Sequence, residues 1–233
     1  MSNVAAILLD IEGTIAPIAF VYDVLFPYAR RELPAYVADH WAEPDVQTAR
    51  AQVAADAGVA DFSREALTGH LMELMDRDAK TTGLKELQGL VWARGYAEGA
   101  LRSQLFPDVP PALRRWHDAG IRIAIYSSGS AAAQRVFLAH TEFGDLTRFF
   151  DGFFDTTSGP KKEAQSYRRI AAKWQQPAES IAFFSDVTGE LDAAEAAGMR
   201  SVLVERPGNA PVADGSHARI TSLEHADAHL HSA

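Results

Sequence analysis

Four short, almost wholly apolar runs constrain the fold of this chain more than any other feature of its sequence. The runs span residues 4–9, 121–126, 181–184 and 201–204, and the first is followed directly by Asp10. Such runs, without polar alternation, are typical of parallel strands buried on both faces. Plausible helices flank them, so the sequence predicts an α/β fold with an open parallel sheet and right-handed crossovers. Ligands of such sheets bind beyond the carboxyl ends of the strands, where we expect the functional site.

The stretch between the first two runs is far too long for one crossover helix, and its apolar residues repeat at helical spacing. Leu67, Leu71 and Leu74 follow this spacing, and we expect them to pack in a helical core rather than to bind a cofactor. Pro27 and Pro34 are expected to break the first helical stretch into pieces. The predicted division is a core of residues 1–16 and 105–233 and a helical insert of residues 17–104.

Composition excludes several classes of function. The formal net charge is −9 and no segment is rich in Lys or Arg, so the surface would repel a nucleic-acid backbone and we expect no nucleic-acid partner. No apolar run approaches the length that spans a bilayer, and an acidic motif by residue 10 leaves no room for a signal segment. We therefore expect a cytoplasmic protein that does not enter a membrane. The absence of cysteine leaves only oxygen and histidine ligands for any metal.

Asp10 and Glu12 place two carboxylates just past the first predicted strand, and Gly13 permits the chain to turn there. This spacing suggests a metal site, because carboxylate oxygens suit Mg²⁺. A carboxylate nucleophile that attacks a dianionic phosphate also needs a cation nearby. The alternative for this segment taken alone is a polar turn with a capping acid.

Ser127 and Ser128 follow the second run, at the expected start of a helix. Their hydroxyls and the backbone N–H groups there could hold phosphate oxygens. Capping of the helix by one of the two serines is an equally natural interpretation.

Lys161 and Lys162 stand just before a helical stretch, where one fixed ammonium could offset the charge of a transferring phosphoryl group. The alternative is a solvated pair at the surface. Asp186 follows the third run as a prospective metal ligand, with Glu190 one helical turn later as a supporting acid. A helix-capping Asp186 and a solvent-facing Glu190 are the alternative.

The acidic strand end, the serine segment, the lysine segment and the second acidic segment, in this order, resemble the haloacid dehalogenase superfamily. The resemblance implies a Rossmann-like parallel-sheet core with an α-helical cap inserted after the first motif. Glu12 stands where most phosphatases of the superfamily carry Asp, and this residue is similar to the pattern of the enolase-phosphatase E1 family. The segments that carry this narrower resemblance are residues 10–14, 17–21, 25–28, 127–130, 154–156 and 206–210.

The narrower resemblance implies a reaction in methionine salvage with a single Mg²⁺ per chain. In it, 2,3-diketo-5-methylthiopentyl-1-phosphate is enolised and then dephosphorylated to an acireductone, 1,2-dihydroxy-3-keto-5-methylthiopentene. By the motifs, Asp10 is nucleophile and metal ligand, Glu12 supplies a backbone carbonyl to the metal or acts as acid and base, and Asp186 completes the ligands. Phosphate would be held by Ser127, Ser128 and Lys161. Pro160 departs from the family pattern.

Three other functions remain open at this stage. The first is a generic small-phosphate phosphatase of the same superfamily, with different cap contacts. The second is a metal-independent dehalogenase, which the acidic residues Glu12, Asp186 and Glu190 disfavour. The third is a receiver-like module in which phosphorylated Asp10 changes affinity for a protein partner. We expect a monomer that acts on a small phosphorylated molecule.

Three histidines close to the C-terminus are near enough in sequence to attract a metal ion: His225, His229 and His231. We expect them instead in a solvated tail.

Overall fold

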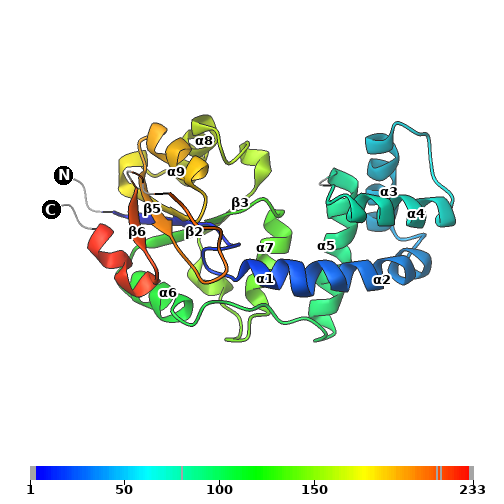
Figure 1. Cartoon of the computed structure of the whole chain (residues 1–233), viewed down its shortest axis with the longest axis horizontal. Helices are drawn as coiled ribbons and strands as arrows, with labels where there is room; N and C mark the ends of the chain where they lie inside the picture. The colour runs from blue at the N-terminus through cyan, green and yellow to red at the C-terminus, as the bar shows by residue number, and fades with distance from the viewer. Residues whose placement is uncertain (1–3, 80, 214, 216, 231–233) are drawn as a thin grey trace. The chain divides into compact units, whose positions relative to one another are not determined.

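The computed structural model describes residues 4–79, 81–213, 215 and 217–230. It divides into two compact units, shown in Figure 1. The first, here called the sheet unit, comprises Met1–Phe20 and Arg102–Ala233, and the second, the helical unit, comprises Val21–Leu101. Whether these units act as catalytic core and substrate cap stays a prediction.

The sheet unit contains a six-stranded, wholly parallel sheet in the order β3-β2-β1-β4-β5-β6. This confirms the predicted α/β architecture. Leu9 at the end of β1 pairs with Ile125 of β2 and with Phe184 of β4, so the first strand is central and buried on both faces. The strands are β1 (Ala6–Leu9), β2 (Arg122–Tyr126), β3 (Gly152–Phe154), β4 (Ile181–Ser185), β5 (Arg200–Val204) and β6 (Ala218–Ile220).

Helices cover both faces of this sheet. On one face, Tyr167 of α8 packs edge-on against Tyr126 of β2 and Phe183 of β4, with ring centroids 5.4 and 5.1 Å apart. On the other, Trp116 of α6 packs against Phe184. The helices of the unit are α1 (Ile18–Phe20), α6 (Val109–Asp118), α7 (Ala131–Ala139), α8 (Ala164–Trp174) and α9 (Thr188–Ala196). Short 3₁₀ turns are η2 (Thr147–Phe149), η3 (Thr156–Ser158), η4 (Ala178–Ser180) and η5 (Leu223–His229).

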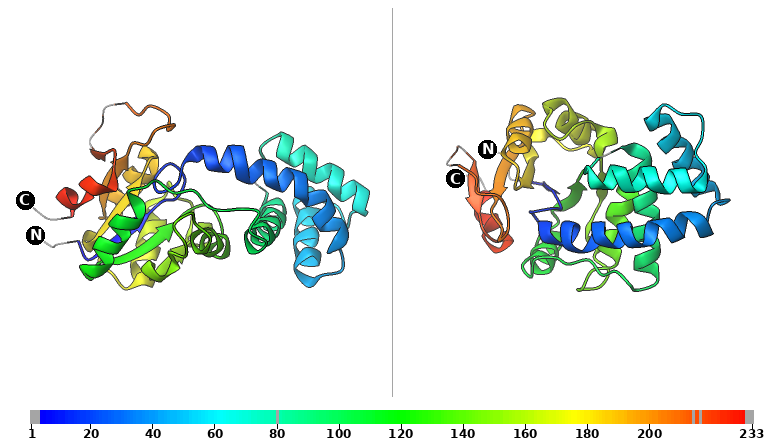
Figure 2. Two further views of the ribbon diagram at one scale, coloured as in Figure 1. Left: turned by 90° about the horizontal axis from the view of Figure 1, so that it is seen from below. Right: turned by 45° about the vertical axis from the view of Figure 1, so that its right-hand side comes forward.

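The helical unit buries the apolar residues that the sequence places at helical spacing. Leu67, Leu71 and Leu74 of α4 are buried in one cluster with residues of α2, α3 and α5, as predicted. The helices of this unit, drawn in two views in Figure 2, are the π-helical turn η1 (Val21–Leu25), α2 (Phe26–Asp39), α3 (Pro44–Ala57), α4 (Arg64–Asp76) and α5 (Thr82–Ala97).

The prolines do not break the first long helix, so that expectation is wrong. Pro27 occupies the first turn of α2, where the missing N–H would have had no partner within the helix. Pro34 lies inside α2 and costs one backbone hydrogen bond. Its neighbours Leu33 and Val37 are buried in the cluster of the helical unit, and we attribute the continuity of the helix to this packing.

The C-terminal histidines lie on a folded segment rather than in a solvated tail. His225 and His229 belong to η5, which buries Leu223 and Ala226 and is followed by the buried Leu230. His231 lies outside the described residues. Within the described chain, no helix combines the length and the apolar character that crossing a bilayer requires.

Candidate active site

Side chains from four loops of the sheet unit meet at the carboxyl edge of the parallel sheet. Asp10 follows β1, and its N–H donates to the carbonyl of Phe184 at 3.0 Å. Ser127 follows β2, Lys161 lies in the segment that leads from β3 to α8, and Asp186 follows β4. The edge lies at the point where the chain crosses from one half of the sheet to the other, the usual place for ligands in this architecture.

Lys161 is buried between two carboxylates. Its Nζ lies 2.7 Å from Oδ1 of Asp10 and 2.7 Å from Oε2 of Glu190, and all three side chains are at most 10% exposed. Burial lowers the pKa of the Lys161 ammonium, but the charges of Asp10 and Glu190 outweigh it and leave that pKa raised. The lysine is therefore a permanent cation. Of the two lysines, Lys161 is buried in this cluster, whereas Lys162 is exposed.

Three hydroxyl groups fix the backbone that carries this lysine. Tyr126 donates to the carbonyl of Gly159 at 2.9 Å, Ser166 to that of Pro160 at 2.7 Å, and Tyr167 to that of Lys161 at 2.7 Å. Gly159 has φ of +126°, a conformation that only glycine adopts readily. Pro160, which departs from the family pattern, is compatible with this loop. The loop is held through its carbonyl oxygens, and proline lacks only the N–H.

The Glu12 carboxylate reaches across to the loop after β2. Its Oε2 accepts a hydrogen bond from Oγ of Ser127 at 3.2 Å. Burial, and after it the charge of Asp10, raise the pKa of the Glu12 carboxyl. Ser127 is buried, whereas Ser128 is exposed, so the structure brings only the first of the two serines into direct contact with the acidic residues.

The serine loop has its own supports. Ser130, rather than Ser127 or Ser128, caps α7 by accepting from the N–H of Ala133 at 3.2 Å. The helix-capping alternative for the two predicted serines is therefore wrong. Gln134 donates from Nε2 to the carbonyls of Gly129 and Phe154, both at 2.8 Å, and so ties this loop to the end of β3.

Asp186 lies against the turn that follows Asp10. Gly13 has φ of +74°, and a Cβ atom at this position would overlap the Asp186 carboxylate. Burial and then the charge of Asp10 raise the pKa of Asp186 to about 6. The same two causes, in the same order, raise the pKa of Glu190 to about 7 despite its ion pair with Lys161. Glu190 thus contacts the lysine directly instead of facing solvent.

These observations fit a hard divalent cation. Asp10, Glu12, Asp186 and Glu190 bring four acidic groups toward one ammonium, and burial followed by the charge of Asp10 raises the pKa values of the other three. In the described part of the chain no N–H or O–H group donates to the carbonyl oxygen of Glu12. No three Asp, Glu or His side chains there already converge on one point as ligands. Mg²⁺ commonly takes only one or two protein carboxylates and completes its shell with water and substrate oxygens.

Several residues of the site escape sequence reasoning. Ser185 donates to Glu190 at 3.0 Å and lies 3.4 Å from Oδ2 of Asp10. It could have been noticed as the polar end of an apolar run. Tyr126 and Tyr167 look like ordinary core residues in the sequence, and nothing there signals that their hydroxyls reach the lysine loop.

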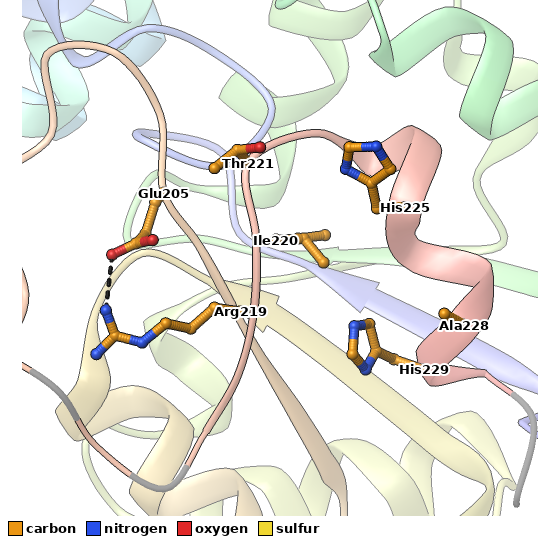
Figure 3. A pocket seen from close by; sticks show the side chains of 7 residues that line it. All are labelled: Glu205, Arg219, Ile220, Thr221, His225, Ala228 and His229. Carbon is orange, nitrogen blue, oxygen red and sulfur yellow. Dashed lines mark hydrogen bonds and ion pairs between the residues drawn. The ribbon is translucent and has the colours of Figure 1, made fainter.

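A separate cavity of about 270 Å³ lies at the carboxyl ends of β5 and β6 and contains none of the predicted site residues. Figure 3 shows Arg219 of this cavity paired with Glu205, at a distance of 2.9 Å. The lining residues of the cavity are Glu205, Arg219, Ile220, Thr221, His225, Ala228 and His229.

Comparison with known proteins gives the class of protein to which this chain belongs. A family model described as "Hydrolase: haloacid dehalogenase-like hydrolase" matches residues 4–198. The chain is thus a haloacid dehalogenase-like hydrolase. The solved structure of CbbY from Rhodobacter sphaeroides in complex with phosphate shares the fold, with a TM-score of 0.62 and 18% identity, covering 95% of this chain and 96% of that one.

Closer relatives narrow the assignment. The chain is 50% identical over 216 residues to "Enolase-phosphatase E1" of Sorangium cellulosum (strain So ce56), covering 91% of this chain and 93% of that protein. It is 50% identical over 217 residues to the protein of the same name from Acidiphilium cryptum (strain JF-5), covering 93% and 91%. The UTR4 protein of Saccharomyces cerevisiae superimposes with a TM-score of 0.82 and 36% identity over 96% of this chain and 100% of that one. The chain belongs to the enolase-phosphatase E1 family.

Proposed function

We propose that this chain is a bifunctional, magnesium-dependent enolase-phosphatase of methionine salvage. It converts 2,3-diketo-5-methylthiopentyl-1-phosphate into 1,2-dihydroxy-3-keto-5-methylthiopentene, an acireductone, and phosphate. The observation that carries the proposal is the contact of buried Asp10 with the charged amine of Lys161, with the carboxyl of raised pKa on Glu12 two residues away. A nucleophile, a cation and a second acid-base group are the parts that the two chemical steps require.

Asp10 is the proposed nucleophile of the phosphatase step. One carboxylate oxygen attacks phosphorus in line with the leaving oxygen, the bond to that oxygen breaks, and an aspartyl-phosphate forms. Water then hydrolyses this acyl phosphate, which restores the Asp10 carboxylate and releases inorganic phosphate. Lys161, which stays protonated, stabilises the charge on the phosphoryl oxygens, and the hydroxyl of Ser127 donates to one of them. Ser128 would assist through its exposed hydroxyl.

Glu12 is the proposed base of the enolisation step. It removes the proton from the carbon beside the dicarbonyl. The electrons of that C–H bond form the C=C bond of the enol, and the carbonyl oxygen takes up a proton. An ordinary glutamate is a weak base at neutral pH, so a raised pKa improves it. The hydrogen bond from Ser127 holds the carboxylate in one orientation. The two acids Asp10 and Glu12 then act in different steps.

Asp10, the backbone carbonyl of Glu12 and Asp186 would hold the magnesium ion. When bound, the ion offsets the charge of the phosphate and polarises the dicarbonyl. Glu190 stays outside this set and holds Lys161 against Asp10 by accepting from its ammonium. We also propose that the enzyme acts as a monomer in the cytoplasm, which light scattering of the purified protein and fractionation of cells would test.

The decisive experiment supplies the methylthio diketone phosphate with Mg²⁺ and then with EDTA. Release of inorganic phosphate and the ultraviolet absorbance of enol and acireductone are followed together. We expect both signals with Mg²⁺ and neither with EDTA. Phosphate release from other small phosphates, without turnover of this substrate, would discard the enolase activity and leave a generic phosphatase. Turnover that persists in EDTA would contradict the magnesium requirement.

A further inference from the structure

We propose that Asn209 and Arg206 are positioning residues for magnesium, acting through the backbone of residues 10–14, here called the nucleophile loop. They fix this loop so that the carbonyl oxygen of Glu12 stays directed at the cation. The inference rests on the proposed function for the role of the ion. Its own basis is a set of hydrogen bonds that reach the loop from a different part of the sheet unit.

The contacts come from the segment that follows β5. Nδ2 of Asn209 donates to the carbonyl of Gly13 at 2.9 Å, and Nε of Arg206 donates to the carbonyl of Thr14 at 3.0 Å. In the sheet, β4 separates β5 from β1, so this segment passes over a neighbouring strand end to reach the loop. The two residues thus act on consecutive peptide groups of the loop.

Three of the five carbonyl groups of the nucleophile loop accept hydrogen bonds within the protein. The carbonyl of Ile11 accepts from the N–H groups of Thr14, Ile15 and Ala16, at 3.2, 3.0 and 3.0 Å. With the carbonyls of residues 13 and 14 bonded to Asn209 and Arg206, those of Asp10 and Glu12 are the two without a donor within the described loop, and that of Glu12 lies directly before the two bonded carbonyls. A carbonyl oxygen that is fixed in direction and has no hydrogen-bond donor is a suitable ligand for a hard cation.

Arg206 is itself held rigidly. Its guanidinium pairs with Asp108 at 2.8 Å, with the two side chains 3% and 10% exposed. Asp108 also accepts from the hydroxyl of Ser222 at 3.0 Å and from the N–H of Leu223 at 2.6 Å. A buried ion pair adds little net stability compared with apolar residues of similar volume, but it can impose one geometry. The geometry imposed here directs Nε at the nucleophile loop.

The loop needs such support because charge repulsion acts on it. Asp186 lies against Gly13, so its carboxylate lies beside the loop that carries the acidic residues Asp10 and Glu12. A loop without external contacts could turn the Glu12 carbonyl away and separate the acidic groups. Removal of a group that hydrogen-bonds to a metal ligand typically weakens metal affinity by about 10- to 100-fold.

The test measures binding of Mg²⁺ by calorimetry on substrate-free protein, beside thermal unfolding and steady-state kinetics. Asn209→Leu keeps the size of the side chain and removes its hydrogen-bond donor. Arg206→Lys keeps the positive charge and removes the planar guanidinium. We expect each variant to weaken Mg²⁺ binding about tenfold and to lower kcat, with KM for the phosphorylated substrate changed less. The variant Asn209→Leu leaves the buried ion pair intact and carries the test if Arg206→Lys does not fold.

Arg115→Gln is the matched control. Arg115 also pairs with an aspartate, Asp227, at 2.7 Å and donates to a backbone carbonyl, that of Leu223, at 3.0 Å. Its partners lie on η5 and not on the nucleophile loop. We expect Arg115→Gln to lower the unfolding temperature while the dissociation constant for Mg²⁺ stays within about twofold of the original.

The outcomes separate this inference from the proposed function. If Asn209→Leu lowers the unfolding temperature and leaves Mg²⁺ binding unchanged, Asn209 has only a structural role and the inference is overturned. If the original protein does not bind Mg²⁺ at all, the inference is likewise overturned. If Mg²⁺ binding weakens as expected but the methylthio diketone phosphate is not turned over, the positioning role stands and the proposed substrate is wrong.

Discussion

The amine of Lys161 lies 2.7 Å from the carboxylate of Asp10, and both groups are buried at the carboxyl edge of the sheet. This ion pair holds the proposed nucleophile beside the one buried ammonium of the described site. Glu190 shares the same ammonium at 2.7 Å, so a single positive charge serves two carboxylates. The site is therefore short of positive charge before a metal ion or substrate binds.

Replacing Asp10 by Asn should abolish phosphate release. The amide is a poor nucleophile and cannot form the aspartyl-phosphate, so we expect the rate to fall by at least about a thousandfold. The fold should persist, because the amide keeps the size of the carboxyl. Phosphate release and circular dichroism measure the two effects, with exposed Asp145→Asn as the control. Retained turnover in Asp10→Asn protein with a native spectrum would refute the assignment.

Glu12→Gln tests the base of the enolisation step. General bases contribute about 10²- to 10⁴-fold, so formation of the enol should slow by an amount in this range. The backbone carbonyl of residue 12 is unchanged in this variant, so Mg²⁺ binding should be largely retained. Ultraviolet absorbance of the enol is the readout. Full enolisation by Glu12→Gln protein would restrict Glu12 to its carbonyl role.

Lys161→Met and Lys162→Met form a matched pair of adjacent substitutions. Loss of Lys161 leaves Asp10 and Glu190 buried without their cation, and breaking such a pair costs about 3–5 kcal/mol of unfolding free energy. Phosphate release should fall at least about a hundredfold as well. Lys162 is exposed, so Lys162→Met should change both quantities little. Urea unfolding and phosphate release measure them, and equal effects of the two substitutions would contradict the buried role.

Without metal, stability should decrease as pH rises toward neutrality. The pKa of Glu190 is raised to about 7 and that of Asp186 to about 6, whereas in the unfolded chain such groups titrate near about 4. Between the pKa of the unfolded chain and that of the folded protein, the folded state holds protons that the unfolded state has lost. The unfolding free energy therefore decreases as the pH rises through this range. In EDTA the unfolding free energy should be higher at pH 5 than at pH 8.

Mg²⁺ and substitution provide the controls for this pH dependence. A bound cation favours the ionised carboxylates, so Mg²⁺ should stabilise the protein more at pH 8 than at pH 5. Glu190→Gln should flatten the pH dependence in EDTA, because it removes a carboxyl whose pKa is raised to about 7. Urea unfolding at both pH values tests this. A metal-free protein that becomes more stable as pH rises would show that other groups dominate.

The sequence predicts the centre of the sheet better than its edges. The apolar runs correspond to β1, β2, β4 and β5, because strands buried on both faces leave a continuous apolar signal. The edge strands β3 and β6 are three residues each, too short for such a signal. In the site, Asp10, Glu12, Ser127 and Asp186 follow the ends of β1, β2 and β4, and Lys161 precedes α8, the positions that the sequence indicates.

The remaining contacts depend on the direction of side chains from distant segments. Glu190 was expected as a supporting acid, but its shared hold on the lysine follows from how α9 packs after β4. Ser128 has the same residue type and almost the same position in sequence as Ser127, yet it points to solvent. Neither fact is encoded in a local pattern, because each is decided by the side chains of other elements.

The hydroxyls of Tyr126 and Tyr167 connect the lysine loop to the most deeply buried part of the sheet unit. The Tyr167 ring packs edge-on against Tyr126 and Phe183, so the backbone of residues 159–161 is anchored to the core, the part of a protein that unfolds locally least often. A loop at the mouth of an active site would ordinarily exchange its amide protons quickly with heavy water. Here the Gly159 amide, which donates to the carbonyl of Thr156 at 3.1 Å, should exchange more slowly than that, and the proposed phosphate-binding amine of Lys161 is carried by a rigid backbone.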